Sequence, residues 1–511
     1  MITRALHEKL RHEKRTIERR LARAKGGMKP RSAGPELATR SVRFELSDRT
    51  RAISAGGLGA ILERVADIGL AKRIDEGLPL LERHRPYHES DHVLNIAYNV
   101  LCGGRTLDDI ELRRNDRVFL DALGARAIPD PTTAGDFCRR FSADDVWTLM
   151  RILNDARVEV WKRRGPALTD QVACIDADGV VVSTQGECKQ GMEYHHPKKV
   201  WGYHPLVVSL GNTQEPLFLV NRSGNRPSSE GAAEVFDAAV EVCRRAGFKR
   251  FRLRGDTDFS LTRHFDRWTE QGARFVFGYD ASQAMVSRAQ GLPDDEFEEL
   301  LRKAKYVLQS QPRAKQPRVK EGIVVEREFF NQILESEELA EFEHKPTRAK
   351  QSYRMIVLAK NIVEERGQQC LGNVVRYFFY VTNDRELTKE QVVAEANGRC
   401  NQENLNAHLK SGVRALRAPL NTLEANWAYM VIVSLAWSLK AWFALLLPAS
   451  PRSRDEHEAE RDSILKMEFR TFLNRFMLIP AQIVRTARRL VFRFLAWRPE
   501  LHILARSLGA T

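Results

Sequence analysis

The sequence predicts an α/β protein with a helical N-terminal region, and three observations lead to this prediction. From 54 to 165, apolar residues recur at spacings of three and four, which is the pattern of amphipathic helices. After Pro166 the pattern changes to short β-rich runs, separated by helical stretches in the order β-β-β-α-β-α-β. A long apolar stretch at 425–447 then follows a further β-rich segment and is favoured as a buried core helix.

The first 53 residues are expected to form a basic arm and a linker. Residues 1–31 carry eleven Lys or Arg against three Glu, and Gly26, Gly27 and Pro30 interrupt the helical pattern. The following segment, 54–165, is predicted to be an all-α domain. Its periodicity is helical throughout, with no β-rich run.

Residues 166–281 are predicted to be the first part of a mixed sheet with helices. The expected strands end before turns or at polar residues, and the expected helices separate the later strands. The predicted strands are 172–183, 204–211, 215–224, a run ending at Asp256, and 274–280, and the predicted helices are 230–246 and 262–271.

Residues 282–384 are predicted to be a β-rich insertion, and 385–448 the second part of the core. The insertion contains a basic stretch at 313–320 and three β-rich runs, IVVEREFF, YRMIVLA and VVRYFFYVTN. Thr388 and Gln391 have the spacing of a capping box, which predicts a helix from Lys389 to about Ser411. The last segment, 449–511, is expected to be a charged linker at 451–462 and a basic helical C-terminal region.

The stretch 425–447 is long and apolar enough to span a bilayer, with Lys440 as its one charged residue. A buried core helix is the alternative. We favour the core helix, because Asn426, Ser434 and Ser438 interrupt the apolar surface and no second span accompanies it. No membrane association is therefore expected.

The net charge and the cysteine content indicate which partners the protein binds and in which cellular compartment it is expected. The 511 residues include 81 Lys and Arg against 67 Asp and Glu, a formal charge of +14 that favours polyanions or anionic membrane surfaces. The seven cysteines form no CxxC pair, which argues against a disulfide framework and against a thiolate zinc site. The charged N-terminal stretch has no apolar segment typical of a secretory signal, so a cytoplasmic protein is expected.

Acidic residues lie on or directly after two of the predicted strands. Asp176 and Asp178 are two apart in one strand, so their side chains share a face. Carboxylates within an apolar strand need a partner or a cation, and Mg²⁺ prefers oxygen ligands; solvated acids at a strand end are the alternative. Asp256 lies where a later strand ends, a position at which open α/β sheets present functional groups, although turn residues are also common there.

The helix after the insertion carries Arg399, Glu403 and Lys410. Their separations of four and seven residues place them along one stripe of the helix. Taken alone, this pattern indicates a solvated ion pair on an ordinary helix surface.

Together these sites resemble the DDE transposases of bacterial insertion sequences, an RNase H-like group whose glutamate helix carries Tyr-x2-Arg-x3-Glu-x6-Lys. Arg399, Glu403 and Lys410 match three of the four positions, and Ala396 replaces the tyrosine. The resemblance covers about 170–445, including the β-rich insertion. It implies an RNase H-like catalytic core.

The first two acidic residues of the family also have counterparts. Asp178-Gly179 resembles the first aspartate motif, with Val180 where the family has threonine, and Asp256-Thr257 resembles the second. Asp178 is preferred as the first ligand, with Asp176 as the alternative.

The resemblance implies a metal-dependent DNA strand cleavage and strand transfer. Asp178, Asp256 and Glu403 would hold two Mg²⁺ ions, with Mn²⁺ able to substitute. One ion would activate water or a 3′-hydroxyl and the other would stabilise the leaving oxygen. Arg399 and Lys410 would contact the flanking phosphates.

The implied partner is double-stranded DNA, both the terminal inverted repeats of the element and the target. A homodimer is expected in the active complex, because two ends must be brought together. The helical region 54–165 and the basic arm are expected to bind the ends or to dimerise. The expected location is the bacterial cytoplasm, at the nucleoid when DNA is bound.

A basic, aromatic-rich loop at 195–205 is a further candidate for DNA contacts. Lys198 and Lys199 suit backbone phosphates and Trp201 suits base stacking, although core packing is the alternative for the aromatic residue. A zinc site is disfavoured, because the nearby Cys188 and histidines lack a ligand spacing. Two other functions remain open, a regulatory DNA-binding protein derived from a transposase and an RNase H-like nuclease that cuts without joining.

Overall fold

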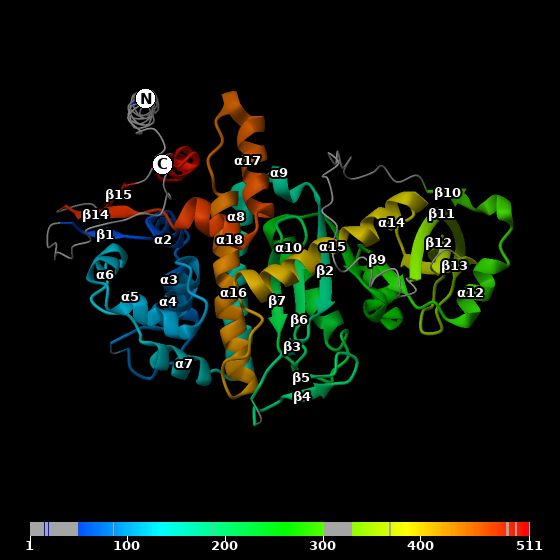
Figure 1. Ribbon diagram of the computed structural model, residues 1–511, viewed down its shortest axis with the longest axis horizontal. Helices are drawn as coiled ribbons and strands as arrows, with labels where there is room; N and C mark the ends of the chain where they lie inside the picture. The colour runs from blue at the N-terminus through cyan, green and yellow to red at the C-terminus, as the bar shows by residue number, and fades with distance from the viewer. Residues whose placement is uncertain are drawn as a thin grey trace. The chain divides into compact units, whose positions relative to one another are not determined.

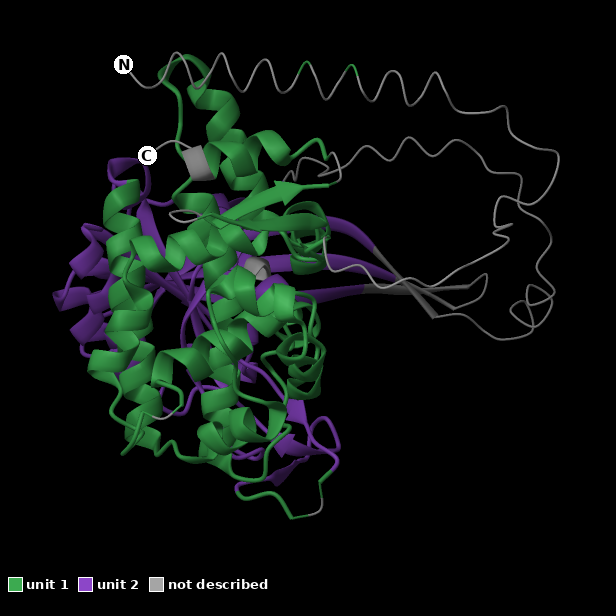
Figure 2. Cartoon of the chain, turned by 90° about the vertical axis from the view of Figure 1, so that its left-hand side faces the viewer, with its two compact units in different colours: residues 1–164, 186–190, 407–511 green, residues 165–185, 191–406 purple. Residues whose placement is uncertain are grey.

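The computed structural model describes residues 15, 19, 50–84, 86–186, 188–300, 330–366, 369–486, 490–495 and 498–509. The chain divides into two compact units, drawn in green and purple in Figure 2. Unit 1 comprises Met1–Arg164, Gly186–Gln190 and Ala407–Thr511, and unit 2 comprises Gly165–Gln185 and Gly191–Asn406. Almost all of the predicted basic arm, the basic stretch 313–320 and most of the first β-rich run of the insertion lie outside the described residues.

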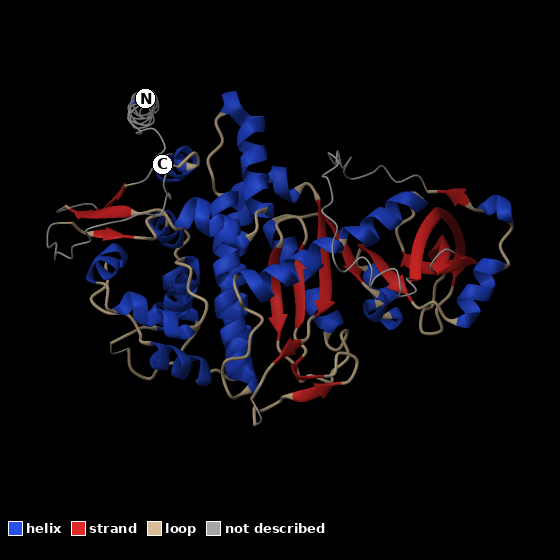
Figure 3. Cartoon of the chain, in the orientation of Figure 1, coloured by secondary structure: helices blue, strands red, loops and turns tan. Residues whose placement is uncertain are grey.

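The N-terminal part of unit 1 is helical, as its periodicity predicts, apart from the short strand β1 (Figures 1 and 3). Capping residues set its helix ends: Asp130 accepts the backbone N–H of Thr133 at 3.0 Å, and Pro131 begins the helix. The elements are β1 (Ala52–Ile53), α2 (Leu58–Asp67), α3 (Leu70–Gly77), α4 (Glu89–Leu101), α5 (Glu111–Arg114), α6 (Arg117–Leu123), α7 (Pro131–Arg139) and α8 (Ala143–Arg164), with a 3₁₀ helix at Leu107–Ile110.

The apolar helix α16 (Leu423–Leu445) is the core of unit 1. Among the described helices it is the one with the length and hydropathy of a membrane span, and its most apolar window is wholly buried against protein. It packs against α4, α7 and α8, and Thr422 caps its first turn. Burial of an entire helix surface inside a unit explains why its sequence has no polar face.

The polar residues of α16 hold neighbouring backbone groups. Lys440 is buried, and its Nζ donates to the carbonyls of Leu465 at 3.0 Å and Met467 at 2.5 Å. Its ammonium group lies 3.7 Å from the Trp437 ring centroid. Burial lowers the pKa of Lys440 to about 7. Lys440 therefore fixes the end of the following helix to α16.

The C-terminal region corrects two sequence-based expectations. The charged stretch expected to be a linker forms helix α17 (Arg454–Lys466), because Arg461 is buried and donates to the carbonyl of Leu447 at 2.7 Å. The basic segment expected to be helical contains an antiparallel pair, β14 (Ala481–Arg485) and β15 (Leu490–Phe494). Burial in β14 alternates from one residue to the next, which is a strand period. The remaining elements are α18 (Phe469–Phe472), a π-helix at Leu473–Met477 and α19 (Leu501–Gly509).

Unit 2 is built on a mixed sheet with the strand order β10-β11-β12-β13-β9-β8-β2-β6-β7. Strands β2, β8 and β9 are parallel to one another, whereas β6 and β7 continue from β2 as an antiparallel meander. The strands are β2 (Val172–Gly179), β6 (Leu206–Leu210), β7 (Glu215–Val220), β8 (Arg250–Gly255), β9 (Ala273–Tyr279), β10 (Glu298–Glu299), β11 (Phe330–His344), β12 (Tyr353–Arg366) and β13 (Gln369–Thr382).

The predicted mixed α/β class is confirmed, and the β-rich insertion continues the same sheet. Strand β13 pairs antiparallel with β9, so the insertion joins the sheet at its edge. A separate three-stranded sheet has the order β3-β5-β4. Its strands and the helices of unit 2 are β3 (Val182–Ser183), β4 (Glu193–His195), β5 (Val200–Tyr203), α9 (Pro166–Thr169), α10 (Ala232–Ala246), α11 (Phe265–Glu270), α12 (Gln283–Gln290), α14 (Lys389–Gly398) and α15 (Cys400–Ala407).

The predicted continuous helix from Lys389 to Ser411 is divided into three segments. The capping box at Thr388 is present, with the Gln391 N–H to Thr388 Oγ1 distance at 3.2 Å. The helix breaks at Arg399 between α14 and α15, and a π-helix at His408–Gly412 follows α15. Breaks of this kind change which residues share a face, and sequence spacing alone does not reveal them.

Candidate active site

Asp178 lies at the C-terminal end of β2, next to a close backbone approach. Its Oδ2 accepts a hydrogen bond from Asn406 Nδ2 at 2.7 Å. The next residue has to be Gly179, because a Cβ there would lie 2.7 Å from Nε2 of the buried His204 ring. Burial, together with the nearby Asp256 carboxylate, raises the pKa of Asp178 to about 6.

Asp256 follows directly after β8, the parallel neighbour of β2. The C-terminal ends of parallel strands lie at one edge of a sheet, so the two aspartates are neighbours. Asp256 also caps a 3₁₀ turn, since its Oδ1 accepts the N–H of Asp258 at 3.0 Å. Burial raises the pKa of Asp256, and the Arg399 guanidinium opposes this shift.

Glu403 on α15 is linked to Asp256 by Arg399, whose guanidinium group lies close to both carboxylates. Arg399 Nη1 lies 3.8 Å from Asp256 Oδ2, and its Nη2 lies 3.4 Å from Glu403 Oε1. Both Arg399 and Glu403 act electrostatically on Asp178 as well. The structure therefore gathers three sequence-predicted acids, Asp178, Asp256 and Glu403, around the guanidinium group of Arg399, which is also a sequence-predicted residue.

Helix α15 is anchored to the sheet by buried amide side chains. Gln402 accepts a hydrogen bond from Ser209 of β6 and donates to the carbonyl of Val207. Asn406, one turn further, reaches Asp178 on β2. These two contacts fix the face of α15 that carries Glu403.

Asp176, the alternative first ligand, is engaged elsewhere. It is fully buried, and its carboxylate accepts two hydrogen bonds from Arg254, at 2.6 Å from Nε and 2.8 Å from Nη2. Burial alone would lower the pKa of Arg254, but the Asp176 charge raises it. Asp176 and Asp178 share a face as predicted, yet Asp176 is committed to a structural ion pair.

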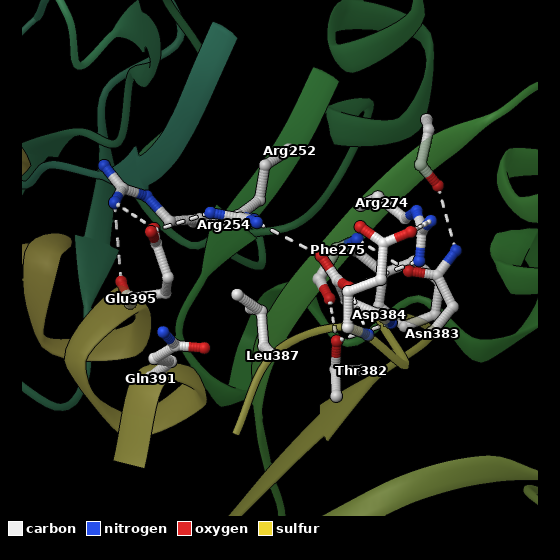
Figure 4. Close-up of polar contacts among 12 residues, drawn as sticks. Arg252, Arg254, Arg274, Phe275, Thr382, Asn383, Asp384, Leu387, Gln391 and Glu395 are labelled. Carbon is white, nitrogen blue, oxygen red and sulfur yellow. Dashed lines mark hydrogen bonds and ion pairs between the residues drawn. The ribbon is translucent and has the colours of Figure 1, made fainter. Parts of the chain in front are cut away.

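The Asp176–Arg254 pair belongs to a network that ties α14 to the sheet. Figure 4 shows the part of this network around Arg252, Arg254 and Glu395. Glu395 of α14 lies 3.0 Å from Arg254 and 2.7 Å from Arg252. Arg252 continues to Asp384, at 3.1 Å, and Arg274 contacts the same carboxylate at 3.2 Å. The network holds the helix that leads into Arg399 and Glu403. In the sequence, the local sign of this ion network is a pair of arginines, Arg252 and Arg254, two residues apart in an apolar strand.

Ala396, at the position of the family tyrosine, packs against apolar residues. It lies on a cluster that includes Val276, Ile356 and Val392. Nothing at this position offers a hydroxyl group toward the carboxylates. The site of this chain is therefore supported by other polar side chains, of which Asn406 contacts an acidic residue directly.

Three of the other sequence-predicted residues belong to the separate sheet β3-β5-β4 and its turn. Lys198 and Lys199 occupy the turn between β4 and β5, and Lys199 has a positive φ of 52°. Trp201 on β5 is 54% exposed and packs edge-on against Tyr194. Lys410 lies in the π-helix His408–Gly412, which belongs to unit 1.

Asn406 is the functional candidate that sequence reasoning missed. It lies three residues after Glu403, a spacing that places both side chains on neighbouring parts of one helix face. That spacing could have identified it. An asparagine in a helix, however, gives no sign that its partner is an aspartate from a strand 228 residues away.

A second group of possible metal ligands lies in unit 1. Donor atoms of His84, His88 and Glu89 lie within 4.8 Å of one another. The two imidazole rings are stacked at 4.6 Å and nearly parallel, so their nitrogen lone pairs do not converge on one point. Glu89 is buried, lies 3.2 Å from His84 and accepts the N–H groups of Leu80 and Leu81. These contacts indicate that Glu89 has a structural role, as the acceptor that holds the segment before α4.

The carboxylates of Asp178, Asp256 and Glu403 suit a hard divalent cation. All three offer oxygen donors, which Mg²⁺ and Mn²⁺ prefer. The raised pKa values of Asp178 and Asp256 show that negative charge is concentrated and partly desolvated here. A cation would relieve that repulsion, which Arg399 relieves in part.

Comparison with known proteins identifies the family. A family model described as "Transposase DDE domain group 1" matches residues 36–510. No curated protein matches the chain. Among solved structures, the chain is similar to a cryo-EM structure of a piggyBac transposase synaptic complex with hairpin DNA, at 11% identity and a TM-score of 0.34, over 84% of this chain and 83% of that chain. Because the family model spans nearly the whole sequence, this protein belongs to the DDE transposases, a family of enzymes that cut and join DNA.

Proposed function

We propose that this chain is the transposase of a bacterial insertion sequence, which cleaves the terminal inverted repeats of its element and joins them to target DNA. The observation that carries the proposal is the convergence of Asp178, Asp256 and Glu403 around Arg399. Two strands and a helix supply these acids in the chain order that the Tyr-Arg-Glu-Lys group implies. The active complex would contain two copies of the chain, one for each end.

The sheet topology supports an RNase H-like core. An antiparallel meander of β2, β6 and β7 is followed by parallel strands β8 and β9, with α10 before β8 and α11 between β8 and β9. This is the β-β-β-α-β-α-β order that the sequence predicts. The acids lie where β2 and β8 end, the edge at which open α/β sheets present functional groups.

Asp178, Asp256 and Glu403 would hold two Mg²⁺ ions. When bound, these cations would supply activation of water or a 3′-hydroxyl and stabilisation of the leaving oxygen in an in-line phosphoryl transfer. Asn406 orients the Asp178 carboxylate by donating to Oδ2. Arg399 balances the carboxylate charge in the absence of cation, and it carries the donors needed to bind a phosphate beside them.

A cytoplasmic location is proposed as well. Among the described residues, Cys102, Cys138, Cys174 and Cys188 are free thiols, which suits a reducing compartment.

Removal of divalent metal tests the proposed function directly. Purified protein with DNA containing both ends of its element should cut and join in Mg²⁺ or Mn²⁺ and should do neither in EDTA. The variant Glu403→Gln should be inactive in every metal. Strand transfer in EDTA, or full strand transfer by Glu403→Gln, would exclude the proposal. Cutting without joining would indicate the nuclease, and binding without cutting the regulatory protein.

Substitution of Asn406 by alanine should weaken metal binding more than DNA binding. Residues that orient a metal ligand commonly contribute about 10–100-fold to metal affinity. We expect the Mn²⁺ dissociation constant of Asn406→Ala, measured by electron paramagnetic resonance, to rise by a factor in that range, and excess metal to restore cleavage. Asn404→Ala, an exposed neighbour on the same helix, is the matched control. Equal Mn²⁺ affinity in both variants would show that Asn406 has no positioning role.

A further inference from the structure

The loop that follows the glutamate helix, 413–422, is basic and contains no acid. Its charged residues are Arg414 and Arg417, and Lys410 lies just before it. No Asp or Glu occurs between Lys410 and Leu423. Arg105, from the turn after α4, belongs to the same charge cluster. Burial lowers the pKa of Arg414, and the charges of Arg417 and Arg105 lower it further. All three arginines belong to unit 1, and Arg105 and Arg417 act electrostatically on Arg414.

These guanidinium groups are not neutralised by protein. Within the described part of the chain, Arg105, Arg414 and Arg417 form no side-chain ion pair, and Arg414 Nε is buried without a hydrogen-bond partner. Asp109, an acid whose charge acts on Arg414, is already engaged, since its Oδ2 accepts the backbone N–H groups of Arg105 at 2.7 Å and Thr106 at 2.9 Å. Like charges repel, so an unneutralised cluster is costly unless an anion binds it.

Arg414 is also held in a conformation that disfavours its own residue type. Its φ is +62°, in the left-handed region where residues with a Cβ are uncommon. Glycine would adopt this conformation without strain. Strained residues of this kind concentrate at binding sites and ligand clamps.

The loop is fixed on the unit by several contacts. The N–H of Val413 donates to the carbonyl of His408 at 2.9 Å. The buried Asn426 side chain binds both the N–H and the carbonyl of Leu420, each at 2.9 Å. Lys189 Nζ contacts the carbonyl of Ala418, and the Gln190 N–H donates to the carbonyl of Asn421 at 2.9 Å. The arginines are therefore presented on a preorganised backbone.

We propose that Arg105, Arg414 and Arg417 form a binding site for the phosphate backbone of double-stranded DNA. This inference rests on the proposed function and deepens it, because it assigns DNA contacts to unit 1, outside the carboxylate site. Three guanidinium groups with free donors match successive phosphates, which bind arginine bidentately. The contacts position the duplex and carry no base specificity.

The test is the salt dependence of DNA binding by the full chain in EDTA, where no cleavage occurs. A fluorescent duplex with one end of the element is the probe, and fluorescence anisotropy is the readout. Each of Arg105→Gln, Arg414→Gln and Arg417→Gln should reduce affinity about tenfold near 0.1 M salt and should reduce the slope of log K against log salt by about 0.9. A scrambled duplex should show the same losses.

Two further variants keep the test decisive. Arg414→Gly removes the backbone strain, so the protein should be at least as stable as wild type and yet lose the same DNA affinity. Arg244→Gln is the control, because Arg244 is exposed but paired with Glu241 at 2.6 Å. The DNA affinity of this variant should equal that of wild type. Wild-type affinity and slope in the arginine variants would overturn this inference and leave the proposed function standing. Absence of metal-dependent cutting by wild type would overturn the function, while these binding losses would still be measurable.

Discussion

Asp178→Asn is expected to abolish DNA cleavage and to make the folded protein more stable. The substitution removes a charged oxygen donor from the proposed metal site, and a neutral amide oxygen is a much weaker ligand for Mg²⁺. The loss of cleavage should be about 10³-fold or more, because the proposed metal-dependent phosphoryl transfer would lose one of its carboxylate ligands. Cleavage of an end-containing duplex, read on a denaturing gel, measures this effect.

The gain in stability follows from the raised pKa of the Asp178 carboxyl. Its folded-state pKa is about 6 against an ordinary value of 3.8, because burial and Asp256 disfavour the charged form. The folded protein therefore loses stability as the pH rises from about 4 to 6, by about 3 kcal/mol in total. The amide of the Asp178→Asn variant has no such charge, so the variant should exceed wild type by about that amount at neutral pH and should not show this pH dependence.

Urea unfolding of both proteins in EDTA, from pH 4.5 to 7.5, measures the difference. The two curves of unfolding free energy should lie closest together at the lowest pH and separate as the pH rises through 6. An inactive variant whose stability equals that of wild type at pH 7.5 would contradict the assignment of Asp178 as a desolvated carboxylate beside Asp256.

Arg254→Met is expected to be the most destabilising substitution in the ion network of unit 2. The substitution removes both hydrogen bonds that Arg254 donates to the fully buried Asp176 carboxylate. It also leaves Arg252 as the one remaining arginine partner of Glu395 in this network. Removing one partner of a buried ion pair commonly costs about 3–5 kcal/mol, because the remaining charge is uncompensated. The midpoint of urea unfolding should fall accordingly.

The double variant Asp176→Leu with Arg254→Met separates charge from packing. Replacing both partners by apolar residues removes the buried charge, so stability should recover most of the loss. The exposed pair Arg244 and Glu241 provides the matched control, since Arg244→Met should change stability by less than about 1 kcal/mol. A loss in Arg254→Met as small as in that control would show that the Asp176 charge is not buried.

The elements with a clear period could be predicted from the sequence. The predicted strand 172–183, the predicted run ending at Asp256 and the predicted helix 230–246 correspond to β2, β8 and α10, although β2 already ends at Gly179. Apolar spacing and turn residues are local signals, which is why these elements are predictable. The family motifs then selected Asp178, Asp256, Glu403 and Arg399, which the structure gathers. The spacing of the family motifs predicts that residues far apart in the sequence meet at one site, whereas hydrophobic periodicity predicts only local helices and strands.

Other features depended on contacts between distant segments. The break at Arg399 and the strands of the C-terminal region have no clear local signal, because arginines between apolar residues fit a helix and a strand equally well. Asp176 and Asp178 were equivalent by sequence, and only the pairing of Asp176 with Arg254 on β8 separates them. Asn406 and the arginines of the loop 413–422 were missed for the same reason.

The most direct test of the transposase assignment is a cleavage assay on the element itself. Purified protein is incubated in Mg²⁺ with DNA that contains its own coding segment and flanks, and the products are resolved on a denaturing gel beside those of Asp256→Ala. We predict discrete cuts at both flanks with wild type and none with the variant. Identical cuts by both proteins would contradict the assignment of Asp256 and of the carboxylate site, and binding without cuts by wild type would contradict the transposase itself.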